Sequence, residues 1–316
     1  MKIFSSVDKF PKNIETAITI GTFDGLHKGH IRVFEDLINI ARKKKIQSLA
    51  LTFFPHPRHV IYPEDNRLYL LNTLQERINR LQKTKLDNFV IQEFNLEFSR
   101  KKSIQFIRDI LVNQLNMKHM IIGHDHHFGR NREGSFDELK ELAQLFSFDL
   151  YRVNAHISDD VIVSSTKIRN LLFSGKIEQA NKMLGYNYCF SGIVVHGEKI
   201  ARSLGFPTCN ISINDTHKLI PSDGVYAVYV DYNNKKYSGM LNIGLDKSSK
   251  NKKKIEVHIF DFNKNIYNDS ITINFVKRIR DEINFINTSD LANQLKMDHE
   301  NCINILKQFK FGKSEQ

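Results

Sequence analysis

The segment ITIGTFDGLHKGHIRVF, residues 18–34, joins an apolar run to an amphipathic stretch through a turn with glycines, an acid and two histidines. The run AITIGTF, residues 17–23, has the length and composition of a buried strand. After it, one helical stripe is formed by Ile31, Phe34, Leu37, Ile38 and Ala41. The segment therefore predicts a strand, a turn and a helix, the repeating unit of parallel α/β sheets.

The same alternation continues through the first half of the chain. Four more β-type runs are separated by stretches with helical spacing, namely SLALTFF (48–54), FVIQEF (89–94), HMIIGH (119–124) and FDLYRV (148–153). Thr73 with Glu76, and Ser135 with Glu138, fit the capping box that begins a helix. We therefore predict a doubly wound α/β layer with a parallel sheet, in which ligands bind at the carboxyl ends of the strands.

After about Gly185 the pattern changes to short strands and turns. Ile255, Val257 and Ile259 alternate with polar residues, as in a strand with one buried face. Asn233-Asn234 lies between two such runs and predicts a hairpin turn, since asparagine tolerates positive φ. We predict an antiparallel β-barrel, followed by a helix from Thr288 to about Phe311 that packs on it through Leu291, Leu295, Cys302, Ile303, Leu306 and Phe309.

Length and composition are those of a two-domain globular protein. The chain has 316 residues, of which 41% are hydrophobic and 26% charged. No apolar run approaches the roughly 20 residues needed to span a bilayer, and MKIFSSVDKF lacks a cleavable leader. We expect a cytoplasmic protein without a membrane partner. Its three cysteines, which form no metal or redox pair, are expected to be free thiols.

The formal net charge of +11 and the basic clusters RKKK (42–45), RKK (100–102) and KNKKK (250–254) raise the possibility of nucleic-acid binding. No aromatic-interleaved strand motif or zinc finger accompanies them, so we interpret them as solvated faces and expect no nucleic-acid partner. A basic surface also suits phosphorylated small molecules. An RNA-associated protein is the alternative, and its affinity would fall steeply with salt.

The turn in the opening segment has the properties of a phosphate site. A strand that ends near Gly21 and a helix that begins near Lys28 place free backbone amides and a positive helix dipole together. Glycines there let a nucleotide approach the backbone, and His27 and His30 can donate hydrogen bonds to phosphate oxygens. The histidines lack cysteines or acids at zinc-site spacing, which disfavours a zinc centre.

These residues resemble a known family. GTFDGLHKGH (21–30) resembles the nucleotidyltransferase His-x-Gly-His signature of bacterial FAD synthetases, the bifunctional riboflavin kinase/FMN adenylyltransferases. Three more segments resemble this family in order: FFPHPRHV (53–60), GHDHHFGRNREG (123–134) and SSTKIRNLLFSG (164–175). The resemblance implies that FMN attacks the α-phosphorus of ATP, releasing pyrophosphate and leaving FAD.

The resemblance assigns roles in this half. His27 and His30 are the expected catalytic residues, and Arg58 and Asp125 are expected to bind flavin. The expected ATP and phosphate contacts are Gly21, Phe23, Asp24, Gly25, Ser164, Ser165, Thr166 and Arg169. Arg130, Arg132 and Lys167 supply further cations near strand ends. His126 and His127 are expected to be loop residues without a catalytic role.

A second motif, GEKIARSLGFPTCNISI (197–213), resembles the riboflavin kinase motif of the same family. Thr208 and Asn210 are two residues apart on an extended chain and point to the same side, so their oxygens can hold Mg²⁺ and ATP phosphates, with Gly197 beside them. A turn in which these side chains only cap backbone groups is the structural alternative. The resemblance makes Glu256 the general base toward riboflavin and Arg280 a flavin-site residue.

The second half also departs from the family pattern. LDKSSKNKKK (245–254) replaces a Pro-Thr segment, Tyr267-Asn268 replaces Tyr-Gly, and LGYNY (184–188) lacks the junction arginine. Asn268 can still adopt a left-handed turn. An FMN adenylyltransferase with a weak kinase domain is therefore the alternative to the bifunctional enzyme.

The sequence thus predicts an adenylyltransferase domain over residues 1–185 and a riboflavin kinase domain over residues 186–316. Riboflavin, FMN, FAD and ATP are the expected substrates and products, with Mg²⁺ as the metal. We expect a monomer or a weak homo-oligomer.

Overall fold

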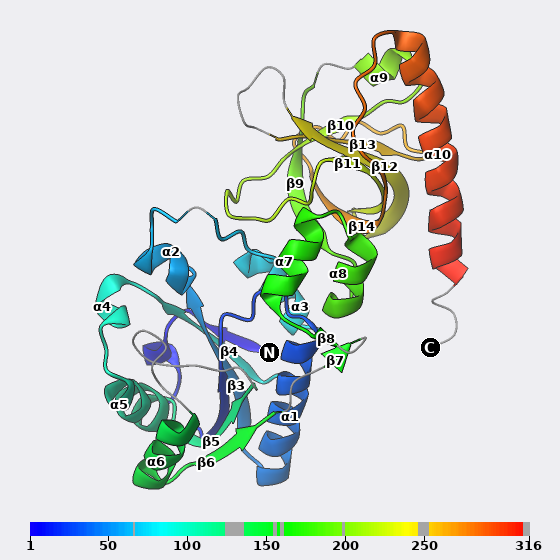
Figure 1. The fold of residues 1–316 in the computed structure, drawn as a ribbon. Coiled ribbons are helices and arrows are strands. Elements are labelled where there is room, and N and C mark those ends of the chain that lie inside the picture. The colour runs from blue at the N-terminus through cyan, green and yellow to red at the C-terminus, as the bar shows by residue number, and fades with distance from the viewer. Residues whose placement is uncertain are drawn as a thin grey trace. The chain divides into compact units, whose positions relative to one another are not determined.

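The computed structural model describes residues 1–65, 67–123, 136–153, 157–158, 161–197, 200–245 and 253–311. These form two compact units, Met1–Ser165 and Thr166–Gln316. Figure 1 shows a layered α/β unit and a barrel unit, which are described separately here.

The first unit is built on a six-stranded sheet in which every neighbouring pair is parallel, with the strand order β1-β4-β3-β2-β5-β6. Its strands are β1 (Lys2–Phe4), β2 (Thr16–Ile20), β3 (Gln47–Phe54), β4 (Asn88–Glu93), β5 (Met117–Ile122) and β6 (Asp149–Arg152). The five predicted strands are all present and the parallel sheet is confirmed. The edge strand β1 was not predicted. A separate hairpin pairs β7 (Ile157–Ser158) with β8 (Val161–Ile162).

Helices cover both faces of this sheet (Figure 1). They are η1 (Val7–Lys9, 3₁₀), α1 (Lys28–Lys44), α2 (Pro57–Ile61), α3 (Leu74–Leu81), α4 (Leu96–Ser99), α5 (Ser103–Gln105), η2 (Phe106–Gln114, a π-helix) and α6 (Phe136–Phe146). Successive strand residues point to opposite faces: Ala17 packs with α1 and α3, whereas Ile18 packs with η2 and α6. Two cores on one sheet confirm the doubly wound layer.

The helix-start predictions have mixed outcomes. At α3 the Thr73 hydroxyl accepts a hydrogen bond from the Glu76 amide at 3.2 Å, and the Glu76 carboxylate accepts one from the Thr73 amide at 3.0 Å. This confirms the capping box. Ser135, predicted to begin the helix now seen as α6, lies outside the described residues.

The second unit contains a closed antiparallel barrel with the strand order β10-β13-β12-β11-β14-β9. Its strands are β9 (Cys189–Val195), β10 (Cys209–Ser212), β11 (Gly224–Tyr232), β12 (Lys235–Leu245), β13 (Lys253–Ile259) and β14 (Ser270–Arg280). Asn233 and Asn234 join β11 to β12 with φ of 47° and 59°, which confirms the predicted hairpin. The predicted barrel is confirmed.

The C-terminal helix α10 (Thr288–Phe311) lies along the barrel (Figure 1). Cys302 and Leu306 are its buried residues in a cluster with Tyr229, Met240 and Phe260 of the barrel. The predicted start and end are confirmed, and Leu295 and Ile303 pack against the same cluster, as predicted. Phe309, also predicted to pack there, lies in the last turn of the helix and is 42% exposed. Among the described helices, none is long and apolar enough to cross a membrane.

Two helices, α7 (Ser165–Phe173) and α8 (Ile177–Leu184), precede the barrel, and a short helix α9 (Ile200–Ser203) follows β9. On α8 the Asn181 side-chain amide donates to the Phe275 carbonyl of β14 at 2.8 Å and accepts from the Tyr188 amide at 2.7 Å. These bonds explain why α8 belongs to the barrel unit. The sequence boundary after residue 185 places α8 in the first domain, and that boundary stays a prediction.

Candidate active sites

The turn between β2 and α1 has an unusual backbone. Phe23, Gly25 and Leu26 have φ of 48°, 86° and 37°, and the Leu26 amide donates to the Phe23 carbonyl at 3.2 Å. Only glycine adopts such a conformation without strain, so Phe23 and Leu26 store conformational energy. The chain then enters α1 at Lys28 with His27 as its N-cap. Strain of this kind is common where a backbone is shaped for a ligand.

His27 and His30 lie together at the start of α1, as predicted. Their rings are stacked, with centroids 3.7 Å apart and planes inclined by 16°. The His27 Nδ1 accepts a long hydrogen bond, 3.4 Å, from the His30 amide. Because this nitrogen accepts, the proton of a neutral His27 ring lies on Nε2, where it can be donated to a ligand.

The His30 ring is held uncharged. Burial, the His27 ring and the Arg77 charge all lower the pKa of His30 well below its usual 6.5. Its Nδ1 is buried without a hydrogen-bond partner among the described residues. The ring of Phe23 meets it edge-on at 5.6 Å. A neutral imidazole at a helix N-terminus, as His30 is here, can donate a hydrogen bond to an anion without the cost of burying a charge.

Three of the predicted phosphate contacts shape this turn. The Asp24 carboxylate is buried and accepts hydrogen bonds from the Leu71 and Asn72 amides, both at 3.1 Å. Phe23 is buried in the core, and a Cβ on Gly21 would lie 2.9 Å from its ring. The Asp24 and Phe23 side chains are thus engaged within the protein. Gly21 and Phe23 can therefore contact a ligand through their backbone.

The Ser164–Thr166 segment meets the same turn at one point. The Ser165 hydroxyl donates to the Asp24 carbonyl at 2.8 Å, so the first residue of α7 lies beside the His-bearing turn. Ser164 is half-buried next to it. Thr166, Lys167 and Arg169 follow on α7 in the second unit, where Arg169 is half-buried and the other two are exposed.

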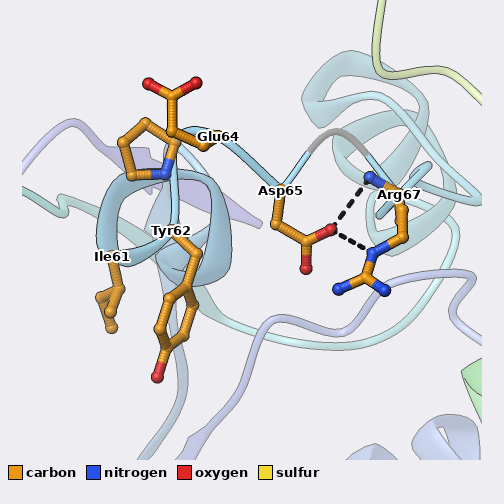
Figure 2. A pocket seen from close by; sticks show the side chains of 6 residues that line it. Ile61, Tyr62, Glu64, Asp65 and Arg67 are labelled. Atoms are coloured by element: carbon orange, nitrogen blue, oxygen red, sulfur yellow. Dashed lines mark hydrogen bonds and ion pairs between the residues drawn. The ribbon is translucent and has the colours of Figure 1, made fainter.

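Arg58 lies on α2 beside a surface cavity of about 680 Å³. The cavity is lined by Ile61, Tyr62, Pro63, Glu64, Asp65 and Arg67. Figure 2 shows the Ile61 and Tyr62 side chains extending together, Glu64 directed away, and Asp65 bonded to Arg67.

The acid of this cavity is ion-paired. Asp65 accepts from the guanidinium groups of Arg67 and Arg58, each at 2.7 Å. Hydrogen bonds from Arg67 and then Arg58 hold the pKa of Asp65 well below its usual range. Arg58 is thereby connected to the cavity. The other predicted flavin contact, Asp125, lies outside the described residues, as do Arg130, Arg132 and the histidines 124, 126 and 127.

The barrel brings the second predicted set together. Asn210 of β10 lies directly opposite Glu256 of β13. Side chains opposite each other on neighbouring strands share a face, and here it is the face opposite Ile255 and Val257, which are buried. A Cβ on Gly197 would collide with the Asn210 side chain, so the glycine leaves room for that side chain in its observed place. Thr208, half-buried, precedes β10.

Glu256 is half-buried and forms an ion pair with Lys254 at 3.5 Å. The nearby oxygens are of the kind that Mg²⁺ prefers, namely a hydroxyl from Thr208, an amide carbonyl from Asn210 and a carboxylate from Glu256. These residues therefore fit a magnesium ion by their chemistry. In the described parts of the chain, no cluster of three or more His, Cys, Asp or Glu residues is arranged to hold a metal.

Arg280, predicted to contact flavin, ends β14 and is held by α10. Its Nε and Nη2 donate to the Asp298 carboxylate, the shortest of these bonds being 2.6 Å. Its Nη1 donates to the Asp281 carbonyl at 2.8 Å. Asp298 is only 1% exposed. Asn268 adopts φ of 65°, which confirms the left-handed turn expected at this departure from the family pattern.

Two residues of these sites were not predicted from sequence. Arg77 of α3 is buried, and its Nη1 donates to the Thr22 carbonyl at 2.5 Å. Its position on the apolar stripe of Leu74, Ile78 and Leu81 is a sequence signal for a buried charge. Asp298 is the second, and it carries the same signal, since it lies three residues after Leu295 and four before Cys302 on the apolar stripe of α10.

Comparison with known proteins gives consistent matches over both units. The FAD synthetase family model matches residues 9–167, and the riboflavin kinase family model matches residues 184–306. A bifunctional riboflavin kinase/FMN adenylyltransferase of Buchnera aphidicola subsp. Schizaphis graminum is 38% identical over 95% of this chain and 97% of that protein. One of Bacillus subtilis is 33% identical over 92% of each chain.

A solved structure resembles the whole chain. A crystal structure described as a macrolide-efflux protein from Streptococcus pneumoniae matches with a TM-score of 0.87 and 28% identity, covering 96% of this chain and 98% of that one. The description of that protein differs from the names of the sequence relatives, whereas its fold is the one described above.

Proposed function

The chain belongs to the family of bifunctional riboflavin kinase/FMN adenylyltransferases, and we propose that its two reactions take place at the two sites described above. The protein phosphorylates riboflavin with ATP to give FMN, and adenylylates FMN with ATP to give FAD and pyrophosphate. The observation that carries the assignment of the second reaction is the stacked His27–His30 pair at the start of α1, in which burial lowers the pKa of His30.

For adenylyl transfer, an oxygen of the FMN phosphate forms a bond to the α-phosphorus of ATP, and the bond from that phosphorus to the bridging oxygen of pyrophosphate breaks. No protein nucleophile is needed. We assign to His27 and His30 hydrogen bonds to the phosphate oxygens, where charge increases in the transition state. The amides of α1 and the turn support the same negative charge through the helix dipole. The Ser164 and Ser165 hydroxyls are proposed to bind the remaining phosphates, and Thr166 and Arg169 stay predicted ATP contacts from the sequence.

For phosphorylation of riboflavin, we assign Glu256 as the general base that takes the proton of the 5′-hydroxyl as its oxygen attacks the γ-phosphorus of ATP. The bond from that phosphorus to the bridging oxygen breaks, and ADP leaves. Beside Glu256, Thr208 and Asn210 supply the oxygens that would hold Mg²⁺, which would neutralise phosphate charge when bound. Gly197 keeps the space that Asn210 occupies. Presence of both family matches and of these three residues favours two activities over an adenylyltransferase with a weak kinase.

We propose that FMN enters the first unit at the cavity beside α2. Ile61 and Tyr62 offer apolar and aromatic surface to a flat ring, and Arg58 with Arg67 offers positive charge near it. Arg280 is retained as a flavin-site residue in the barrel, where its bonds to Asp298 hold it in place. Cytoplasmic location and a monomeric or weakly oligomeric state stay predictions from the sequence.

Separate sites predict separable activities. We expect His30→Ala to remove FAD formation from FMN and ATP while riboflavin phosphorylation continues, and Glu256→Gln to do the reverse. Products are measured by chromatography after incubation with riboflavin or FMN, ATP and Mg²⁺. Glu300→Gln, an exposed acid on α10, serves as the matched control for Glu256→Gln. In a folded variant, loss of both activities from either substitution would contradict the assignment.

A further inference from the structure

Two side chains connect the turn between β2 and α1, the His-bearing turn, to α3 and the segment before it. One of these side chains comes from the turn and the other comes from α3. Asp24 of the turn accepts hydrogen bonds from the Leu71 and Asn72 amides, both at 3.1 Å. Arg77 of α3 donates to the Thr22 carbonyl of the turn at 2.5 Å. The Asp24 carboxylate of the turn thus holds two amides of the segment before α3, and the Arg77 guanidinium of α3 holds a carbonyl of the turn. Each segment fixes the backbone of its neighbour.

The α3 side of this brace is itself rigid. The capping box of Thr73 and Glu76 lies between the two contact points and fixes the first turn of α3. The Arg77 Nη1 is also 3.3 Å from the Thr52 hydroxyl of β3. The guanidinium therefore joins the turn, the central sheet and α3 in one network, over separations of 25 and 55 residues.

Arg77 is a poor choice for stability alone. Its side chain is 3% exposed and its Nε is buried without a hydrogen-bond partner among the described residues, which costs free energy. Burial lowers the pKa of Arg77, and the Asp24 charge opposes that shift. A guanidinium nevertheless stays protonated at neutral pH. The fold thus keeps a costly buried cation next to a candidate catalytic ring.

The charge of Arg77 also acts on His30. Among the described residues, the charged or titratable groups that act on the His30 ring are His27 and Arg77, with Asp24 beside Arg77. Both His27 and Arg77 oppose protonation of His30. The Asp24 carboxylate has two opposing effects on phosphate binding. Its charge repels phosphate, but the two backbone hydrogen bonds that it accepts shape the turn that binds phosphate.

We propose that Arg77 is a positioning residue for adenylyl transfer, and that together with Asp24 it clamps residues 22–24 so that His27 and His30 face the phosphates of the nucleotide. This inference rests on the proposed function of the turn. The clamp holds the turn through its backbone, and the guanidinium adds to the effects of burial and of His27, which lower the pKa of His30. Alignment of this kind governs rate, since a displacement of about 1 Å costs about 100-fold.

The test compares Arg77→Met, Arg77→Lys and Asp24→Asn in the full-length protein. We expect Arg77→Met to lower kcat for FAD formation about 100-fold and to raise the pKa of His30, measured by NMR titration of the imidazole. Arg77→Lys keeps the charge, so the pKa of His30 stays low and part of kcat returns. Asp24→Asn lowers kcat, and its effect is non-additive with that of Arg77→Lys because both act on one clamp.

Three readouts separate the possible outcomes. Far-UV circular dichroism and the thermal unfolding transition report whether each variant is folded, and Arg108→Met, at an exposed arginine of η2, is the matched control. Wild-type kcat together with an unmoved His30 titration in Arg77→Met would overturn the proposal. If Arg77→Met does not fold, wild-type kcat for FAD formation in both Arg77→Lys and Asp24→Asn overturns the proposal. Absence of FAD formation by the wild-type protein would instead refute the proposed function.

Discussion

The ring of His30 is uncharged at neutral pH because three features act on it in the same direction. Burial removes water from the ring, and the stacked His27 ring and the Arg77 guanidinium disfavour a second or third positive charge nearby. A neutral ring still donates one hydrogen bond. His30 can therefore support a phosphate oxygen without first gaining a proton.

The lowered pKa of His30 makes stability depend on pH. The unfolded chain binds a proton at this residue near pH 6.5, whereas the folded protein does so only at lower pH. Stability contributed by His30 is thus present above about pH 6.5 and lost as the pH falls below it. We expect urea midpoints followed by circular dichroism to fall less steeply between pH 6.5 and 5 in His30→Gln. Parallel curves for both proteins would contradict this sign.

Among single residues, the sequence identified those that belong to a local motif. It missed the contacts between residues that are far apart in the chain. His27 and His30 are three residues apart in one turn, so their proximity follows from the helix itself. Arg77 and the Thr22 carbonyl are 55 residues apart, and Arg280 and Asp298 are 18 apart. No periodicity encodes such pairs, since they depend on how elements pack.

Among the elements, α10 is fastened to the barrel by an apolar cluster and by one buried ion pair. Asp298 accepts three hydrogen bonds from Arg280 and one, at 2.9 Å, from Gln294. The ring of His299 lies 4.4 Å from that of Phe260 and 6.0 Å from that of Phe206. The Phe206 loop carries the second sequence motif, so α10 supports the candidate kinase site from outside the barrel.

Breaking the ion pair should loosen this support. In Asp298→Asn the Arg280 guanidinium loses its buried counter-charge, and we expect the free energy of unfolding of the barrel unit to fall by about 3 kcal/mol. Urea unfolding measures this change. Glu300→Gln on the exposed side of the same helix should change stability by less than about 0.5 kcal/mol. Equal effects from the two variants would contradict the role of Asp298.

Element bounds were predictable where a period persists over many residues. The extent of α10, residues 288–311, follows from apolar positions repeated over its length. The Asn233-Asn234 turn follows from the chemistry of two residues. By contrast, β1 has only three residues, too few for alternation to show, and it exists because it pairs with β4. The π-helical form of η2 leaves no pattern in its sequence that distinguishes it from an α-helix.

On the scale of the whole molecule, each unit carries its own candidate site. The family matches end at residue 167 and resume at residue 184, so α7 and α8 lie almost entirely between them. The compact units divide at Ser165, because α8 is bonded to β14 and to Tyr188. Sequence motifs located the sites, whereas these bonds, which no motif contains, decide where one unit ends.

The central claim is that the turn after β2 binds the phosphates of ATP for adenylyl transfer. The most direct test is a crystal structure of the full-length protein with a non-hydrolysable ATP analogue and Mg²⁺. We expect the phosphates at the N-terminus of α1, within hydrogen-bond distance of His27 and His30. A nucleotide bound at the barrel alone, with the turn empty at saturating analogue, would contradict the account.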